Sequence, residues 1–231
     1  MKYSLILLAA GKGTRFGKET PKQFLPLAGK PMIMHTLERV EHLNAVSEVV
    51  VVCNDEYVRT IQMYLDKYGI LKKVVFAKGG KTRQESVHNG LKVASNEAII
   101  IHEAARPLVS LAEFENLIYC SFDNASFTSS VPFTVLKKNG EGVISDILNR
   151  DELVNIQLPQ KFVKKDLLAC HEFAVKDGRL FTEDASMMKF YLNKSIKCIP
   201  GSSTNIKITE YTDLLIGEIF FKEKFMEESI S

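Results

Sequence analysis

The hydrophobic positions in the first half of the chain form short apolar runs separated by longer amphipathic stretches. The runs cover residues 4–8, 48–52, 74–77 and 98–101, and each is bounded by a turn residue or a polar cluster. Apolar runs of this length with such boundaries predict buried β-strands. Because they alternate with longer segments, we expect βα units and a mostly parallel sheet.

The stretches between these runs have the spacing of amphipathic helices. Apolar residues recur at intervals of three and four in residues 31–41, 56–68 and 82–93, as for Ile61 and Leu65. Helices with one apolar face cover a parallel sheet by packing that face against it. The first half of the chain therefore predicts an α/β fold with a central, mostly parallel twisted sheet.

The pattern changes after Ser126, where β-prone residues alternate around the dipeptide Asn139-Gly140. Asn-Gly favours a tight hairpin turn, so residues 133–148 predict a projecting β-arm. Beyond the arm, the pattern predicts helices at 164–175, 183–191 and 213–226 and a strand at 195–199.

A start signal precedes the second of these later helices. Thr182 followed by Glu183 and Asp184 is typical of an N-cap with acidic residues in the first turn. No repeat, low-complexity segment or linker interrupts the chain. We therefore expect residues 1–231 to form a single domain, with the arm at about 133–150.

Composition narrows the class of protein without naming a function. Of the 231 residues, 45% are hydrophobic, which is enough for a sizeable core, and the formal net charge is only +2. A chain this close to neutrality has no basic stripe for nucleic acid, so phosphate recognition must be local. The four cysteines lack metal-site spacing, and the first apolar run is too short for a signal peptide or membrane span. We expect a cytoplasmic protein that acts on no membrane.

A glycine loop follows the first apolar run. Gly11 and Gly13 would place backbone N–H groups at the carboxyl edge of the sheet, where phosphate binds in open α/β folds. The loop is not a Walker loop, because Lys12 is followed by Gly13. It also departs from the dinucleotide fingerprint, because Phe16 stands where the third glycine should be.

Two cations near this loop suggest the chemistry. Arg15 and Lys22 suit a triphosphate whose α-phosphorus is attacked, because negative charge grows on its oxygens in the transition state. The residues alone also allow a simpler interpretation, in which the glycines make a tight turn and both cations are solvated.

Several segments together resemble the 2-C-methyl-D-erythritol 4-phosphate and ribitol 5-phosphate cytidylyltransferase family. They are LAAGKGTRFG at 8–17, PKQF at 21–24, GGKTRQESVHNGL at 79–91, IHEAARP at 101–107, LPQKF at 158–162 and NIKIT at 205–209. Their order and spacing cover nearly the whole chain. The resemblance implies a Rossmann-like nucleotidyltransferase fold, transfer of CMP from CTP to a polyol phosphate for isoprenoid biosynthesis, and a homodimer in which the arm completes the neighbour's site.

The resemblance also implies a role for each matching residue. Arg15 and Lys22 would stabilise the pentacoordinate phosphorus, and Arg150 and Lys207 would position the acceptor phosphate. The residues implied in nucleotide binding are Ala9, Ala10, Gly11, Gly13, Gly79, Gly80, Arg83, Ser86 and Ala104. Those implied on the acceptor side are Arg106 and Thr134. Glu103, at the end of an apolar run, would bind Mg²⁺, although it could instead cap the next turn or pair with Arg106.

This chain departs from the family pattern at three positions. Glu103 stands where the family has Asp, and Leu136 and Leu158 stand where the acceptor pocket has threonines, although Thr134 could supply a hydroxyl from a shifted register. Lost hydroxyl donors would weaken phosphate binding, which leaves the acceptor open. We expect methylerythritol phosphate, with ribitol 5-phosphate or another polyol phosphate as the alternative. A sugar 1-phosphate nucleotidyltransferase using UTP or dTTP and a non-catalytic nucleotide-binding protein are the other candidates.

Overall fold

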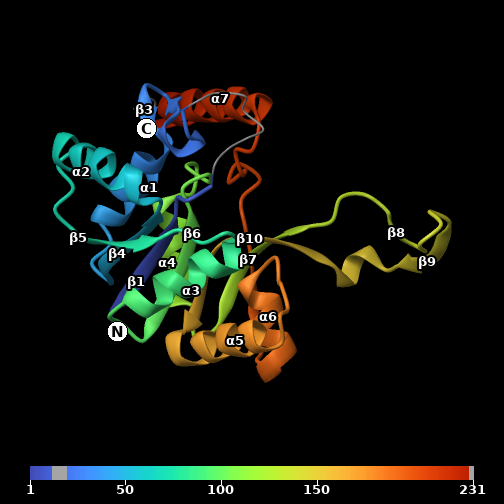
Figure 1. The fold of residues 1–231 in the computed structure, drawn as a ribbon. Helices are drawn as coiled ribbons and strands as arrows, with labels where there is room; N and C mark the ends of the chain where they lie inside the picture. The colour runs from blue at the N-terminus through green and yellow to red at the C-terminus, as the bar shows by residue number, and fades with distance from the viewer. Residues whose placement is uncertain (12–19, 229–231) are drawn as a thin grey trace.

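A seven-stranded sheet forms the centre of the computed structural model, which describes residues 1–11 and 20–228 (Figure 1). The strands of this sheet, in chain order, are β1 (Tyr3–Leu8), β4 (Val46–Cys53), β5 (Lys73–Lys78), β6 (Ala98–Glu103), β7 (Ala125–Ser130), β10 (Val154–Val163) and β11 (Lys197–Pro200). Their spatial order is β11-β7-β10-β6-β1-β4-β5. The runs of apolar residues predicted as strands are all confirmed, with small extensions at their ends.

Most neighbouring strands are parallel, and β10 is the exception. β1 pairs in parallel with β4 and β6, and β10 runs antiparallel to both β6 and β7. The reversal follows from the connection: between β7 and β10 the chain leaves the sheet as the arm, without a crossover helix, and returns in the opposite direction. The predicted α/β fold with a mostly parallel sheet is confirmed.

Helices cover both faces of the sheet. They are α1 (Met32–Glu41), α2 (Val58–Lys67), α3 (Arg83–Val93), α4 (Leu111–Tyr119), α5 (Lys164–Lys176), α6 (Asp184–Leu192) and α7 (Tyr211–Glu228). One buried cluster joins α1, α2 and α4 to the face of β1 that carries Leu5 and Leu7. A second joins α3, α5 and α6 to the face that carries Ile6. Successive side chains of β1 therefore pack alternately into the two buried clusters, as expected of a strand buried on both faces.

The C-terminal helix α7 builds a third, smaller cluster. Its Leu214 and Phe221 pack with Leu27 of the two-residue strand β2 (Pro26–Leu27), which pairs with β3 (Lys30–Pro31). α7 lies beside β3 in Figure 1. No helix among residues 1–11 and 20–228 has the length and apolar character needed to cross a membrane.

The predicted arm is a hairpin of β8 (Val135–Lys138) and β9 (Ile144–Leu148) that projects away from the helices and the sheet (Figure 1). Its turn is wider than the Asn-Gly dipeptide predicts. The Asn139 side chain accepts hydrogen bonds from the N–H groups of Glu141 and Val143, and the positive φ falls on Gly142 at 84°. The turn is therefore organised by an Asn side chain with a later glycine, and Gly140 needs no special conformation.

Candidate active site

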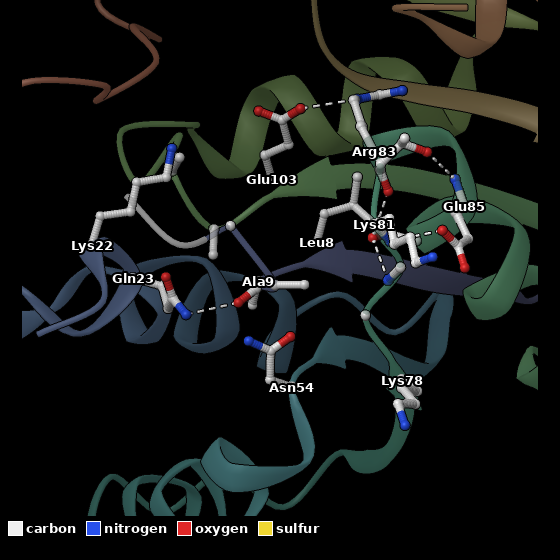
Figure 2. Close-up of a pocket in the computed structure, with 18 of the residues that line it drawn as sticks. Leu8, Ala9, Lys22, Gln23, Asn54, Lys78, Lys81, Arg83, Glu85 and Glu103 are labelled. Carbon is white, nitrogen blue, oxygen red and sulfur yellow. Dashed lines mark hydrogen bonds and ion pairs between the residues drawn. The ribbon is translucent and has the colours of Figure 1, made fainter. Parts of the chain in front are cut away.

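A cavity of about 700 Å³ opens at the carboxyl ends of β1, β4, β5 and β6. This is the edge at which open α/β sheets bind ligands. The cavity is lined by Leu8, Ala9, Ala10, Gly11, Lys22, Gln23, Asn54, Lys78, Gly79, Gly80, Lys81, Thr82, Arg83, Glu85, Ser86, Glu103, Ala104, Ala105 and Lys207. Lys22 lies on one side of it and Arg83, Lys81 and Glu85 on the other (Figure 2).

The residues after β1 form the floor of the cavity. Ala9 N–H donates to Val52 O at 2.8 Å, so the chain continues along β4 before it turns. Gln23 is buried and its Nε2 donates to Ala9 O at 2.8 Å, as the dashed line in Figure 2 marks. This bond fixes the short 3₁₀ helix Lys22–Phe24 against the end of β1 and so holds Lys22 at the cavity. Gly13 and Arg15 lie outside the described residues.

The glycines after β5 form one wall. A Cβ on Gly79 would lie 2.4 Å from Ala10 Cβ, and one on Gly80 would lie 2.5 Å from Glu85 Cβ. Real Cβ contacts are never this short, so both positions require glycine for close packing. The loop is held by Gly79 N–H, which donates to Cys53 O at 2.8 Å.

Ser86 is tied to this wall by its hydroxyl. Oγ accepts from Gly80 N–H at 3.0 Å and donates to Thr82 O at 2.9 Å. Thr82 in turn caps α3, since its Oγ1 accepts from Glu85 N–H at 3.0 Å. One hydroxyl lone pair of Ser86 is left to accept a bond from a ligand in the cavity.

Glu103, the last residue of β6, lies between two cations. Its Oε1 accepts from Arg83 Nε at 3.0 Å, and Lys207 Nζ lies 2.6 Å from its Oε2. Each oxygen of the buried Glu103 carboxylate therefore faces a cation, Arg83 at Oε1 and Lys207 at Oε2. The alternative in which Glu103 pairs with Arg106 does not hold, because the ion pairs of Glu103 are with Arg83, twenty positions earlier, and Lys207.

Arg83 connects Glu103 to the start of α6. Its Nη1 donates to Asp184 Oδ2 at 2.7 Å, and its Nη2 lies 3.0 Å from Glu183 Oε2. Asp184 is buried and its other oxygen meets His171 Nε2 at 3.2 Å. The predicted helix start and its acidic first-turn residue, Asp184, are confirmed, but the predicted side-chain N-cap bond is not made. Glu183 is the cap residue and makes no side-chain cap bond, because its carboxylate is turned to Arg83.

The two buried carboxylates are held in the charged form. Burial acts to raise the pKa of Glu103, but Lys207 and Arg83 outweigh it and lower the pKa from 4.5 to about 2. Asp184 follows the same logic: burial is opposed by Arg83 and His171, and the pKa falls to about 2. Glu103 is therefore a fixed negative charge in a cavity that also presents four lysines, Lys22, Lys78, Lys81 and Lys207.

The residues predicted on the acceptor side divide into two groups. Lys207 lines the cavity. Arg106 does not, and its Nη1 donates to Asn205 O, two positions before Lys207, at 2.8 Å. Thr134 and Arg150 are exposed on the arm and its base, and Arg150 Nη1 donates to Pro132 O at 3.1 Å. Within one chain, the structure does not bring these two residues to the cavity.

The structure does not place Leu158 at the cavity, where the comparison with the family pattern predicted it. It is 1% exposed and belongs to the core cluster that contains Phe162 and Leu167. The position is therefore a core position in this chain, and the leucine removes no hydroxyl from the cavity. Leu136, by contrast, is exposed on the arm.

The residues present fit a magnesium ion that arrives with a nucleotide. No group of three or more His, Cys, Asp or Glu among the described residues could hold a metal by itself. Mg²⁺ needs only one or two protein carboxylates when phosphates and water fill the remaining positions. Glu103 is a charged carboxylate that lines the cavity, and its Oε2, which pairs with the partly exposed Lys207 in this structure, is the oxygen on the cavity side.

Sequence reasoning missed several residues of the cavity. Gln23 lies in the PKQ segment, but the motif predicts no role for it, and no pattern in the sequence points to Asn54, Lys78, Lys81 or Glu85. The Gly79 and Gly80 assignments could have led to Glu85, which packs against Gly80, but only the fold brings Asn54 to the same wall.

Comparison with known proteins gives one consistent result. The family model described as IspD, 2-C-methyl-D-erythritol 4-phosphate cytidylyltransferase, matches residues 3–223. A relative of that name from Clostridium botulinum is 38% identical over 221 residues, covering 94% of this chain and 96% of the relative. A chloroplastic relative of that name from Oryza sativa is 35% identical, covering 96% of this chain and 75% of the relative.

Solved structures agree with these matches. The crystal structure of 4-diphosphocytidyl-2C-methyl-D-erythritol synthase from Anaerococcus prevotii has a TM-score of 0.85 at 25% identity, covering 96% of each chain. The 2-C-methyl-D-erythritol 4-phosphate cytidylyltransferase from Thermus thermophilus has a TM-score of 0.73 at 27% identity, covering 95% of this chain and 98% of that one.

Proposed function

This chain belongs to the 2-C-methyl-D-erythritol 4-phosphate cytidylyltransferase family, and from that premise we propose the reaction it catalyses. It transfers CMP from CTP to 2-C-methyl-D-erythritol 4-phosphate and releases pyrophosphate. The observation that carries the proposal is the cavity, where glycine-lined walls, Lys22, Lys207 and Glu103 meet at one sheet edge.

The chemistry is a single in-line displacement. An oxygen of the acceptor phosphate attacks the α-phosphorus of CTP, the bond from that phosphorus to the bridging oxygen breaks, and pyrophosphate leaves with the electron pair. No protein nucleophile is required, because an anionic phosphate is already a nucleophile. The barrier comes from repulsion between two polyanions, which fixed cations offset.

We assign the cations of this chain by the side of the cavity they serve. Lys22, with Arg15 beyond the described residues, would bind the phosphorus as its charge grows. Lys207 would bind the acceptor phosphate, together with Arg150 and the nearby Arg106. Lys207 contacts the same carboxylate as Arg83, so the acceptor site and the nucleotide site share Glu103.

The base would lie against Gly79 and Gly80. Cytosine carries an amino group at the position where uracil carries a carbonyl, and the remaining lone pair of Ser86 can accept from that amino group but not from the carbonyl. Ala9, Ala10, Gly11 and Ala104 would line the rest of the nucleotide site. This arrangement supports CTP over UTP or dTTP.

We propose Mg²⁺ as the cofactor, held by Glu103 and the triphosphate. When bound, it supplies neutralisation of phosphate charge. The protein's own contribution is the oriented carboxylate: Arg83 binds Oε1, and Lys207, which is partly exposed, pairs with Oε2 on the cavity side.

We propose that the active unit is a homodimer. Thr134 and Arg150 lie on the arm, away from the cavity of their own chain, so they would serve a neighbour's cavity. The arm exposes Phe133 at 79% and Ile147 at 77%, an apolar surface suited to burial against a second copy. The four cysteines are free, which supports the cytoplasmic location we propose.

An acceptor panel tests the reaction. Purified protein is incubated with CTP, Mg²⁺ and either 2-C-methyl-D-erythritol 4-phosphate, ribitol 5-phosphate or other polyol phosphates, and pyrophosphate release is measured. We expect turnover with methylerythritol phosphate. Turnover with ribitol 5-phosphate alone would replace the acceptor, and CTP binding without turnover on any acceptor would indicate a non-catalytic nucleotide-binding protein.

A further inference from the structure

Asn205 is a fully buried polar residue that the proposed mechanism does not use. It lies two positions before Lys207 in the NIKIT segment and is 0% exposed. Its Nδ2 donates to Glu113 Oε1 at 2.9 Å and to Leu158 O at 2.8 Å. Both donors of the amide are therefore bound to groups on other parts of the fold.

The backbone of Asn205 is held as firmly as its side chain. Its carbonyl oxygen accepts from Arg106 Nη1 at 2.8 Å and from Gln157 Nε2 at 3.5 Å. Arg106 follows β6, and Gln157 belongs to β10. One residue thus ties the NIKIT segment to two strands and, through Glu113, to the start of α4.

A second anchor lies on the other side of Lys207. Ile208 N–H donates to Ala105 O at 2.7 Å, and Ile208 is fully buried. Ala105 stands two residues after Glu103. Lys207 is therefore carried by a short segment fixed at both ends, and its Nζ lies 2.6 Å from Glu103 Oε2 although its side chain remains 37% exposed.

We propose that Asn205 is a positioning residue for the acceptor side of the active site. It sets the place of Lys207 through the backbone and the place of the Arg106 guanidinium through its carbonyl oxygen. The inference rests on the proposed function, since it takes Lys207 and Arg106 as the cations that meet the acceptor phosphate. It assigns no role to Asn205 in binding CTP, because its contacts are with Glu113, Leu158, Arg106 and Gln157 rather than with the glycine walls.

An amide side chain at position 205 matches the hydrogen-bonding groups around it. Glu113 Oε1 and Leu158 O are both acceptors, and asparagine supplies two donors on one nitrogen. Asn205 Oδ1 has no hydrogen-bond partner among the described residues, so the amino half does the anchoring. Aspartate would place a carboxylate against two acceptors, and alanine would leave both acceptors buried without a donor.

The test compares Asn205→Ala and Asn205→Asp with a matched buried asparagine. Asn124 is 6% exposed, its Oδ1 accepts from Val163 N–H at 3.4 Å, and it lies away from the cavity. Asn124→Ala therefore reports what loss of a buried amide does to the fold alone. For each variant we would measure the melting temperature, the Kd for CTP by calorimetry, and kcat and KM for the acceptor.

We expect the Asn205 variants to raise the acceptor KM or lower kcat by about 10²-fold, the effect of a small misplacement of a binding group. The Kd for CTP should stay within about twofold of wild type, and Asn124→Ala should leave both constants unchanged. Unchanged acceptor kinetics, or an equal loss of CTP affinity, would overturn the proposal.

A second variant and a wild-type control ensure that every outcome can be interpreted. If the Asn205 variants do not fold, Glu113→Gln replaces one acceptor oxygen with a donor and should show the same split at smaller size; wild-type kinetics in that variant would count against the proposal. Wild-type turnover is measured first. Failure of the wild type on every acceptor refutes the proposed function, whereas an active wild type with unaffected Asn205 variants refutes the positioning role only.

Discussion

Replacing Glu103 by glutamine is the perturbation that separates charge from shape at the active site. Glutamine keeps the size of the side chain but removes the negative charge that Arg83 and Lys207 share. Arg83 retains Glu183 and Asp184 as partners, and Lys207 is partly exposed, so neither cation becomes a fully buried unpaired charge. The change therefore measures the carboxylate's own contribution.

The size of the effect follows from the pKa of Glu103. A fall from 4.5 to about 2 corresponds to roughly 3 kcal/mol of stability, at about 1.4 kcal/mol for each pH unit. Because the pKa is lower in the folded than in the unfolded chain, this contribution is complete above about pH 4.5. It disappears as the pH falls from 4.5 through about 2.

The assay is urea unfolding of wild type and Glu103→Gln at several pH values. At pH 7 we expect the variant to be less stable by about 3 kcal/mol, and the gap should close as the solution is acidified. Glu48→Gln is the matched control, because the pKa of Glu48 is also lowered to about 2, there by hydrogen bonds from Ser4 and Ser95 against the effect of burial.

Both variants should lose stability with the same pH dependence, but only Glu103→Gln should raise the Mg²⁺ concentration needed for half-maximal turnover. A Glu103→Gln protein as stable as wild type at pH 7, or a gap that widens in acid, would refute the electrostatic reasoning. An unchanged Mg²⁺ requirement would refute the metal assignment alone.

Other changes probe the remaining parts of the account. Gly79→Ala places a Cβ 2.4 Å from Ala10 Cβ, so calorimetry should show at least about tenfold weaker CTP binding; wild-type affinity would mean that this wall does not meet the nucleotide. Lys22→Ala should lower kcat far more than CTP affinity in steady-state and binding assays, and equal losses would contradict a transition-state role. Leu158→Thr should cost about 2 kcal/mol in thermal unfolding by burying a hydroxyl in the core, with the acceptor KM unchanged; a lower KM would return this position to the acceptor site. Ile147→Asp on the exposed arm should shift sedimentation to a folded monomer and reduce turnover, and a dimer with full activity would show that Ile147 is not in the interface.

Local patterns along the chain predicted the elements well. The apolar runs at 4–8 and 98–101 are central strands because each is buried on both faces, a condition that leaves a clear mark in the sequence. The direction of β10 could not be predicted in the same way. It depends on how the chain returns from the arm, and the alternation in the arm carries no information about that path.

The glycine walls and Lys22 could be proposed from the sequence because their roles depend on short motifs. The partners of Arg83 could not, since Asp184 lies 101 positions away and its local surroundings favour a helix cap. In the folded chain the carboxylates of Glu183 and Asp184 pair with the buried Arg83 guanidinium instead of capping the helix. Leu158 shows the same limit: the neighbouring Pro159 and Gln160 fixed its alignment, but the side chain points into the core.

The most direct test of the central claim is product identification in a single competition reaction. Protein, Mg²⁺ and CTP are mixed with equal amounts of 2-C-methyl-D-erythritol 4-phosphate and ribitol 5-phosphate. The cytidine diphosphate esters are then separated and identified by mass spectrometry. The account predicts that the methylerythritol ester accumulates with one pyrophosphate for each CTP consumed. Accumulation of the ribitol ester instead, or no ester at all while CTP still binds, would contradict it.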